Sequence, residues 1–234
     1  MIMNDTASGD DIVPEGDAGS AARYYKRDFW SKENLKFSQP HYRLEKSARI
    51  IKRIAGTREC TLLDVGCGPA TLMRVLPSNI QYYGIDMAIH EPEPNLMEAD
   101  LVKNPIGFGD KQFDIVVAQG IFEYVGDQQS QKFSEIADIL NPDGVFITSY
   151  WNFGHRGRQV YWAHNNVQPF ADFRADLERH FKVNKCYPVC HNWHHSFPSR
   201  PLNKAVNRYL NVNIPFLSPM LAVEYFCICS PRSR

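Results

Sequence analysis

Four apolar runs recur along the chain, and each has the length and composition of a strand that is buried on both faces. The runs are TLLDVG, QYYGID, FDIVVAQ and GVFITSYW. Continuous runs of this kind are typical of parallel sheets, because helices cover both faces of such a sheet. Two more strands are predicted at Lys182–Cys190 and Ala222–Ser230, and a further short one before Asp100.

Segments with helical periodicity lie between several of these runs. His41–Ala55 carries a stripe of apolar residues that ends at Gly56. Asp127 is positioned to cap a second helix, which the sequence Asn141-Pro142-Asp143-Gly144 would stop. Pro169 is suited to open a third helix. Strands that alternate with helices predict an α/β fold in which a mostly parallel sheet has helices on both faces.

The amino-acid composition narrows the class of protein only slightly. With 44% hydrophobic and 22% charged residues, the chain is typical of a globular protein. No apolar run reaches the roughly 18 residues that span a bilayer, and the amino terminus lacks the regions of a signal peptide. Residues 1–22 are acidic and are predicted to form a disordered tail. The six cysteines form no CxxC pair and match no common zinc spacing, so a reduced cytoplasmic protein without a metal is expected. The lack of a long apolar run predicts no membrane partner.

Charge is balanced overall but not along the chain. The 26 basic and 26 acidic side chains argue against a dedicated nucleic-acid binder. Residues 151–234 are nevertheless basic, with 11 Lys and Arg against 4 Asp and Glu. This excess fits either a solvated surface or the attraction of an anionic acceptor.

The segment LLDVGCGPATL has the pattern of a ligand-binding turn. A buried strand is predicted to end at Val65, after which the chain turns through Gly66-Cys67-Gly68 into a short helix with Pro69 in its first turn. Glycines permit positive φ and let a ligand approach the backbone closely, and a helix amino terminus offers N–H groups to an anion. A GxG turn alone fits nicotinamide and flavin dinucleotides equally well.

Three polar residues extend this pattern. Asp86 ends the second strand, 22 residues after Asp64, where a carboxylate can hold a ribose diol. Asp100 follows the third strand, where a side chain can meet an adenine amino group. Gln119 ends the fourth strand, at the edge where doubly wound sheets hold their ligands.

This ordered set, over residues 62–150, resembles the class I (Rossmann-like) S-adenosylmethionine-dependent methyltransferase family. The resemblance implies one domain over residues 23–234, a seven-stranded sheet with an antiparallel last strand, and S-adenosylmethionine as the cofactor. It implies that Asp64, Gly66 and Gly68 frame the methionine part of the cofactor and that Asp86 binds the ribose. The other implied cofactor residues are Cys67 as a small spacer, Met87, Asp100, Leu101, Gln119 and Tyr25.

Two features depart from the related patterns. Thr71 stands where a dinucleotide fingerprint has its third glycine, which disfavours a pyrophosphate. Family members usually have a helix between the second and third strands, but Pro92 and Pro94 make a helix improbable in AIHEPEPN.

The acceptor side is expected to use loops and segments outside this core. Residues 23–56 combine the first helix with an aromatic segment, including Tyr25, that either closes over the cofactor or staples the amino terminus to the core. His155, after the fifth strand, is a candidate general base, and Tyr124 is a second catalytic candidate. Arg156 and Arg158 can pair with an anionic acceptor. Residues 191–219 form an insert between the last two strands that we expect to shape the acceptor site.

The favoured function is transfer of a methyl group to an oxygen or nitrogen of a small molecule, such as a metabolite, sugar, lipid or natural product. Three alternatives stay open: a tRNA or rRNA methyltransferase, a nicotinamide-dependent oxidoreductase, and a protein that binds the cofactor without catalysis. An RNA substrate would require a basic surface that carries aromatic residues. No recognisable RNA-binding appendage and no NPPY-like motif is present.

Overall fold

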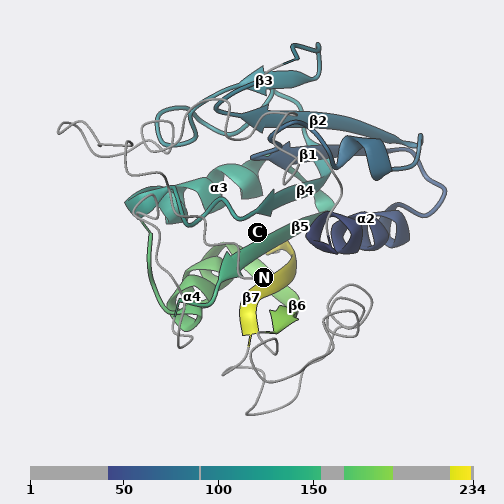
Figure 1. The fold of residues 1–234 in the computed structure, drawn as a ribbon. Coiled ribbons are helices and arrows are strands. Elements are labelled where there is room, and N and C mark those ends of the chain that lie inside the picture. The colour runs from purple at the N-terminus through teal and green to yellow at the C-terminus, as the bar shows by residue number, and fades with distance from the viewer. Residues whose placement is uncertain (1–41, 90, 154–165, 192–221, 233–234) are drawn as a thin grey trace, which may run out of the picture.

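A computed structural model describes residues 42–89, 91–153, 166–191 and 222–232 of the chain (Figure 1). The predicted acidic tail at 1–22, the aromatic segment with Tyr25, and most of the insert at 191–219 lie outside these ranges. None of the helices within the described ranges is long and apolar enough to cross a membrane.

Seven strands form one sheet in the order β3-β2-β1-β4-β5-β7-β6. Strands β1 to β5 run parallel to one another, whereas β7 is antiparallel to both of its neighbours, β5 and β6. The predicted α/β fold with one antiparallel strand is therefore confirmed. The strands are β1 (Cys60–Val65), β2 (Ile80–Asp86), β3 (Leu96–Glu98), β4 (Phe113–Gln119), β5 (Leu140–Trp151), β6 (Phe181–His191) and β7 (Ala222–Pro231).

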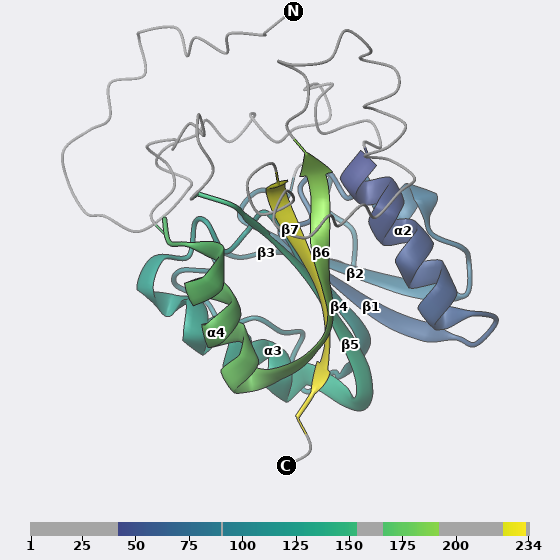
Figure 2. The same cartoon turned by 90° about the horizontal axis from the view of Figure 1, so that it is seen from below.

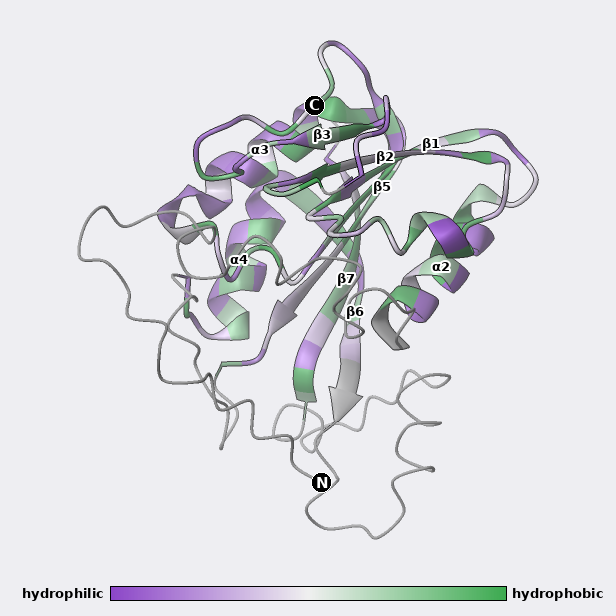
Figure 3. Cartoon of the chain, turned by 45° about the horizontal axis from the view of Figure 1, so that its top comes forward, coloured by the Kyte–Doolittle hydropathy of each residue, from purple (hydrophilic) through white to green (hydrophobic). Residues whose placement is uncertain are grey.

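Helices cover the sheet on both faces, as predicted. Helix α2 (Tyr42–Ala55) lies on one face, and α3 (Gln129–Ile139) and α4 (Phe170–His180) lie together on the other (Figure 2). Hydrophobic and hydrophilic residues alternate along all three helices, as expected when one side of each faces the sheet (Figure 3).

Two apolar cores result, one on each face of the sheet. The core under α2 contains Ile51 and Leu62, both fully buried. The core under α3 and α4 is rich in aromatic rings, with Tyr150 stacked on Phe173 at a centroid separation of 4.1 Å. Because residues of β1 and β4 are buried on both faces, these strands read as continuous apolar runs in the sequence.

The start of α3 and the start of β5 differ from the sequence prediction. Asp127 does not cap α3, because it lies inside a 3-10 turn (Gly126–Gln128). The N-cap of α3 is Gln128. Residues 141–144 follow the helix but belong to β5, which already begins at Leu140. The side-chain amide of Asn141 donates to Asp114 at 3.0 Å, which holds this irregular extension against β4.

The predicted helix after the glycine turn is also wrong. Ala70 has a φ of 51°, a left-handed conformation that cannot continue a right-handed helix. Only a 3-10 turn (Met73–Val75) follows. The turn therefore does not lead into an α-helix whose amino terminus could offer N–H groups to an anion. In contrast, the described part of residues 87–95 contains no helix, as Pro92 and Pro94 predict.

Candidate active site at the carboxyl edge of the sheet

The strand ends bring the predicted polar residues to one edge of the sheet. In the parallel register, Val65 lies opposite Ile85 on β2 and Ala118 on β4. The residues that follow these three positions are Gly66, directly after β1, Asp86 at the end of β2 and Gln119 at the end of β4. The glycine turn is therefore flanked by a carboxylate on one side and an amide on the other, which is where ligands bind to doubly wound sheets.

The glycine turn is held by backbone hydrogen bonds to β2. Gly66 and Cys67 both donate to the carbonyl oxygen of Ile85, at 2.7 and 3.1 Å. Gly66 has a φ of +78°, and a Cβ there would come within 1.9 Å of Ile121 Cδ1. Gly68 has a φ of +52°, but no atom lies within 4 Å of where its Cβ would be. Gly66 therefore has a backbone conformation that favours glycine and packs closely against Ile121, whereas Gly68 leaves open space at the outer side of the turn.

Asp86 joins this turn to the end of β2. Its Oδ2 accepts a hydrogen bond of 2.8 Å from the backbone N–H of Gly68, and its Oδ1 accepts one of 3.3 Å from Ala88. The side chain is 9% exposed. The carboxylate thus fixes the shape of the turn and keeps its charge beside the open space at Gly68.

Asp64 lies beneath the turn and is almost completely buried. Its Oδ2 accepts a hydrogen bond of 2.8 Å from the hydroxyl of Tyr82. Burial raises the pKa of the Asp64 carboxyl to about 7, the Tyr82 hydrogen bond opposes this rise, and the charge of Asp86 adds to it. Asp64 therefore changes charge near neutral pH.

Cys67 fills the space between the turn and β2. Its side chain is buried, and a Cβ on Gly84 would lie 2.8 Å from its sulfur. Burial, followed by the charges of Asp86 and Asp64, raises the pKa of the Cys67 thiol well above its usual value. A protonated, enclosed thiol is a packing group and a poor nucleophile.

Gln119 presents an unsatisfied donor at the end of β4. Its Nε2 atom is buried and has no hydrogen-bond partner among the residues that the structure describes. The next residue, Gly120, donates its backbone N–H to Ser149 Oγ at 3.2 Å, which ties this strand end to β5. A buried amide without a partner costs free energy, and a bound ligand that accepts a hydrogen bond relieves that cost.

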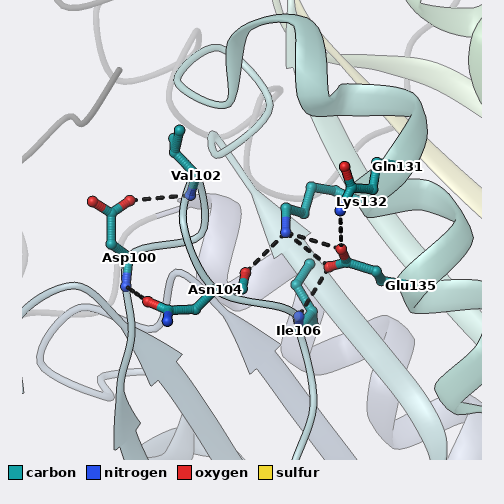
Figure 4. Close-up of polar contacts among 7 residues, drawn as sticks. All are labelled: Asp100, Val102, Asn104, Ile106, Gln131, Lys132 and Glu135. Carbon is teal, nitrogen blue, oxygen red and sulfur yellow. Dashed lines mark hydrogen bonds and ion pairs between the residues drawn. The ribbon is translucent and has the colours of Figure 1, made fainter. Parts of the chain in front are cut away.

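Asp100 is engaged by its own loop. Its Oδ1 accepts from the backbone of Val102 at 3.0 Å (Figure 4). Its Oδ2 lies 3.4 Å from Lys103 Nζ. The loop is fastened to α3 because Lys132, which is 2% exposed, donates to the carbonyl of Asn104 and to both oxygens of Glu135. The following residue, Leu101, packs against the core under α3. The predicted adenine contacts of Asp100 and Leu101 stay predictions.

Glu123 holds the loop after β4 against the end of β5, a role that the sequence did not indicate. Glu123, which is 1% exposed, accepts a hydrogen bond of 3.0 Å from the backbone of Trp151 and bonds through its carbonyl to Asn166. The neighbouring Tyr124 is half-buried and donates its backbone N–H to Ile121. The catalytic candidate Tyr124 therefore lies on a fixed loop at the carboxyl edge.

A small open pocket of about 90 Å³ adjoins the outer side of the turn. It lies between the glycine turn and the segment that connects β2 to β3. Met87, which directly follows Asp86, starts this segment and is half-buried. The pocket is lined by Gly68, Pro69, Ala70, Met73, Arg74, Ile89, Glu91, Glu93 and Leu96.

Several predicted residues lie outside the described ranges. These are Tyr25, His155, Arg156 and Arg158, together with the side chains of the insert. Within the described ranges, no three His, Cys, Asp or Glu side chains are grouped so that they could hold a metal ion.

Comparison with known proteins agrees with this geometry. A family model described as a methyltransferase domain matches residues 40–209. No curated protein matches the chain. A solved S-adenosylmethionine-dependent methyltransferase from Archaeoglobus fulgidus is 18% identical, with a TM-score of 0.59 over 87% of this chain and 100% of the other.

Two further solved structures share the fold at low identity. The CcbJ methyltransferase from Streptomyces caelestis is 11% identical, with a TM-score of 0.59 over 89% of this chain and 100% of the other. A third match is a chain in the Haloferax volcanii complex between the Trm112 methyltransferase activator and a methyltransferase. It is 17% identical, with a TM-score of 0.57 over 89% of this chain and 98% of the other. The family match covers most of the chain and the sheet has the order expected of this fold, so the protein belongs to the methyltransferase domain family and is a class I S-adenosylmethionine-dependent methyltransferase.

Proposed function

We propose that the protein transfers the methyl group of S-adenosylmethionine to an oxygen or nitrogen of a small-molecule acceptor. The observation that carries the cofactor site is the arrangement around the glycine turn. Asp86 is bonded to Gly68 on one side, and the unsatisfied amide of Gln119 lies at the end of β4 on the other. The open space at Gly68 gives a ligand access to the backbone between them.

The residues present fit this cofactor. Gly66 and Gly68 let the methionine part approach the backbone, and Asp64 beneath the turn offers a carboxylate to its ammonium group. Asp86 is suited to accept hydrogen bonds from the ribose hydroxyls, and the Gln119 amide is suited to donate to an acceptor atom of the cofactor. Bound S-adenosylmethionine supplies a methyl group that its sulfonium already activates.

The chain's own contribution to the reaction is to align the acceptor and to exclude water, which can supply much of the rate. Met87, Asp100 and Leu101 complete the proposed adenine side, and Cys67 acts as the spacer beneath the turn. Tyr124 stands on the loop that Glu123 fixes to β5, where its hydroxyl can orient an acceptor. His155 as a general base and Tyr25 as part of a lid over the cofactor complete the proposed set of residues.

The acceptor is proposed to bind among the loops after β4 and β5 and the insert at residues 191–219. The basic excess of residues 151–234 favours an anionic small molecule. The same excess supports a second candidate, a tRNA or rRNA acceptor, whose binding would weaken steeply with added salt. A cytoplasmic location stays a prediction from the sequence.

Two experiments test this function. Titration calorimetry of the pure protein should detect binding of S-adenosylmethionine and S-adenosylhomocysteine, but not of NAD(H). Transfer of labelled methyl groups into a cell extract should then label small molecules, and treatment of that extract with ribonuclease should leave the labelling unchanged. Binding of NAD(H) alone would show an oxidoreductase, loss of the label with ribonuclease would show an RNA acceptor, and cofactor binding without transfer would show a non-catalytic protein.

Asp86 provides the matching site test. Asp86→Asn keeps an oxygen that can accept from Gly68, whereas Asp86→Ala removes it. If the carboxylate binds the ribose, both variants should lose most of the cofactor affinity while remaining folded. If Asp86 only shapes the turn, Asp86→Asn should bind nearly as well as the wild type, and the ribose assignment would be wrong.

A further inference from the structure

Two cysteines face each other across the β6–β7 pair, far along the sheet from the glycine turn. Cys186 on β6 lies directly opposite Cys227 on β7 in the antiparallel register. Their sulfur atoms are 3.4 Å apart. Neither is joined to another cysteine, so the pair is a dithiol.

The backbone at this position already suits a disulfide. Directly opposite residues in an antiparallel pair have Cα atoms about 4.5–5.5 Å apart. Disulfides span Cα separations of about 4.4–6.8 Å. Rotation of the two side chains is therefore sufficient to bring the sulfurs into bonding distance, and the strands need not move.

The two thiols have different environments. Cys186 is half-buried on β6, and the hydrogen bond from Cys227, followed by the charge of Arg174, lowers the pKa of its thiol despite burial and the charge of Glu178. Cys227 is fully buried, and the same hydrogen bond together with burial raises the pKa of its thiol. Cys186 is the less buried of the two residues and has the lower thiol pKa, so it is the better nucleophile of the pair.

Charged side chains from α4 lie near the pair. Arg174 and Glu178 reach Cys186 from α4, where they form an ion pair of 2.7 Å with each other. Cys229 lies on the same face of β7 as Cys227, but in the register it stands opposite Val183. Cys229 therefore has no cysteine across from it and provides a natural comparison.

We propose that Cys186 and Cys227 form a reversible redox site that reacts with low-molecular-weight disulfides such as oxidised glutathione. The Cys186 thiolate attacks one sulfur of the small disulfide, forms a mixed disulfide and releases one thiolate, which takes up a proton. Cys227 then loses its proton to solvent and attacks Cys186 Sγ, which releases the second small thiol. Two protein thiols are oxidised to one disulfide, and one small disulfide is reduced to two thiols.

The disulfide would join β6 to β7 covalently. The connection between these strands contains the insert at residues 191–219, so oxidation would close that segment into a loop whose two ends are fixed. The proposal concerns the sheet edge alone and does not depend on the methyl acceptor.

The test is to incubate the full chain with oxidised glutathione, block the remaining thiols, and map the peptides without reduction. The wild type should lose two free thiols, release two molecules of glutathione per chain, and yield one peptide pair linked through residues 186 and 227. An excess of reduced glutathione should restore both thiols. A wild-type chain without the 186–227 link, including one linked through Cys190, would overturn the proposal.

Variants separate the two roles. Cys186→Ser should abolish the reaction at residue 227, whereas Cys227→Ser should stop at a stable glutathione adduct on Cys186. Cys229→Ser, which changes a buried thiol on the same face, should form the disulfide as the wild type does. Cys227→Ala replaces Cys227→Ser if circular dichroism shows that the serine variant is unfolded. Loss of the link in Cys229→Ser would contradict the assignment. So would absence of the adduct in the folded Cys227 variant at an alkaline pH, at which the Cys186 thiol ionises without the hydrogen bond from Cys227.

Discussion

The hydroxyl of Tyr82 donates a hydrogen bond of 2.8 Å to Asp64 Oδ2, between the buried strands β2 and β1. This bond stabilises the ionised form of the carboxyl, whereas burial and the nearby charge of Asp86 stabilise the protonated form. Burial dominates, so the pKa of Asp64 lies at about 7. The charge beneath the proposed cofactor site therefore depends on pH in the physiological range.

Tyr82→Phe removes this donor and keeps the ring. A hydrogen bond to a charged group contributes about 1.5–3 kcal/mol, so its loss should raise the pKa of Asp64 by about one pH unit or more. If Asp64 must be ionised to receive the cofactor's ammonium group, the pH at which binding of S-adenosylhomocysteine is half-maximal should rise by the same amount. Calorimetric titrations over a series of pH values would measure this shift.

Tyr83→Phe is the matched control for Tyr82→Phe. Tyr83 is the next residue on β2 but packs on the opposite face, against Phe108 and Phe113. Removal of the Tyr83 hydroxyl should leave the pH profile of S-adenosylhomocysteine binding unchanged. Equal profiles for the wild type and Tyr82→Phe would mean that Tyr82 does not act on binding through Asp64. No binding by the wild type at any pH would instead refute the cofactor site itself.

The wild-type protein should bind the cofactor more tightly as pH rises through 7. Below pH 7 Asp64 carries a proton that binding must expel, and above pH 7 the carboxylate is already ionised. Affinity should therefore increase about tenfold between pH 6 and pH 8 and then level off. Calorimetry in two buffers of different ionisation enthalpy should detect release of close to one proton per cofactor at pH 6. Affinity that does not vary with pH would be the contrary result.

The pH dependence of stability has the opposite sign. Asp64 has a higher pKa in the folded chain than in the unfolded chain, so between about pH 4 and pH 7 the folded state retains a proton that the unfolded state has lost. The free energy of unfolding should fall as pH rises through this range. Asp64→Asn cannot ionise, so from pH 5 to pH 8 it should lose about 2–3 kcal/mol less stability than the wild type. Urea unfolding at both pH values would measure the difference, and parallel losses would contradict the raised pKa.

Gly68→Ala should weaken cofactor binding out of proportion to its effect on stability. At a φ of +52° an alanine costs about 1–2 kcal/mol, but no atom stands where its Cβ would be. Gly56 at the end of α2 has a φ of +57° and equally open surroundings, away from the site. Gly68→Ala and Gly56→Ala should therefore lower thermal stability similarly, and only Gly68→Ala should lower cofactor affinity, by about tenfold or more. Equal affinities in the two variants would show that no ligand approaches Gly68.

The strand ends were predictable from the sequence because apolar runs mark buried parallel strands. Val65, Asp86 and Gln119 end their strands as predicted. With β1 between β2 and β4 in the sheet, these ends place the glycine turn between a carboxylate and an amide. Local conformation was harder to predict. The left-handed Ala70 prevents the helix that Pro69 favours, and nothing in the composition of the turn indicates such a φ at an alanine.

Contacts between distant residues account for most of what the sequence did not reveal. The bond between Tyr82 and Asp64 follows from the register of β1 and β2, in which Tyr82 lies opposite Leu62 and so shares a face with Asp64. A parallel register can be guessed once both strands are known, so this pair had a usable signal. The hydrogen bond between Glu123 and Trp151 had no signal in the sequence, because it depends on how the loop after β4 folds back on β5.

Gln119→Leu tests the unsatisfied amide at the end of β4. The substitution removes a buried donor that has no partner among the described residues, so the free energy of unfolding should stay unchanged or rise by about 1 kcal/mol. If this amide donates to the cofactor, affinity should fall about tenfold, because one hydrogen bond is lost. Gln112→Leu is the control, since Gln112 precedes β4 at the opposite end, is exposed, and its side-chain amide donates a long hydrogen bond of 3.5 Å to the carbonyl of Asp138. Unfolding and calorimetric titrations of both variants give the two quantities. Cofactor affinity retained in Gln119→Leu, or lost equally in Gln112→Leu, would remove Gln119 from the site.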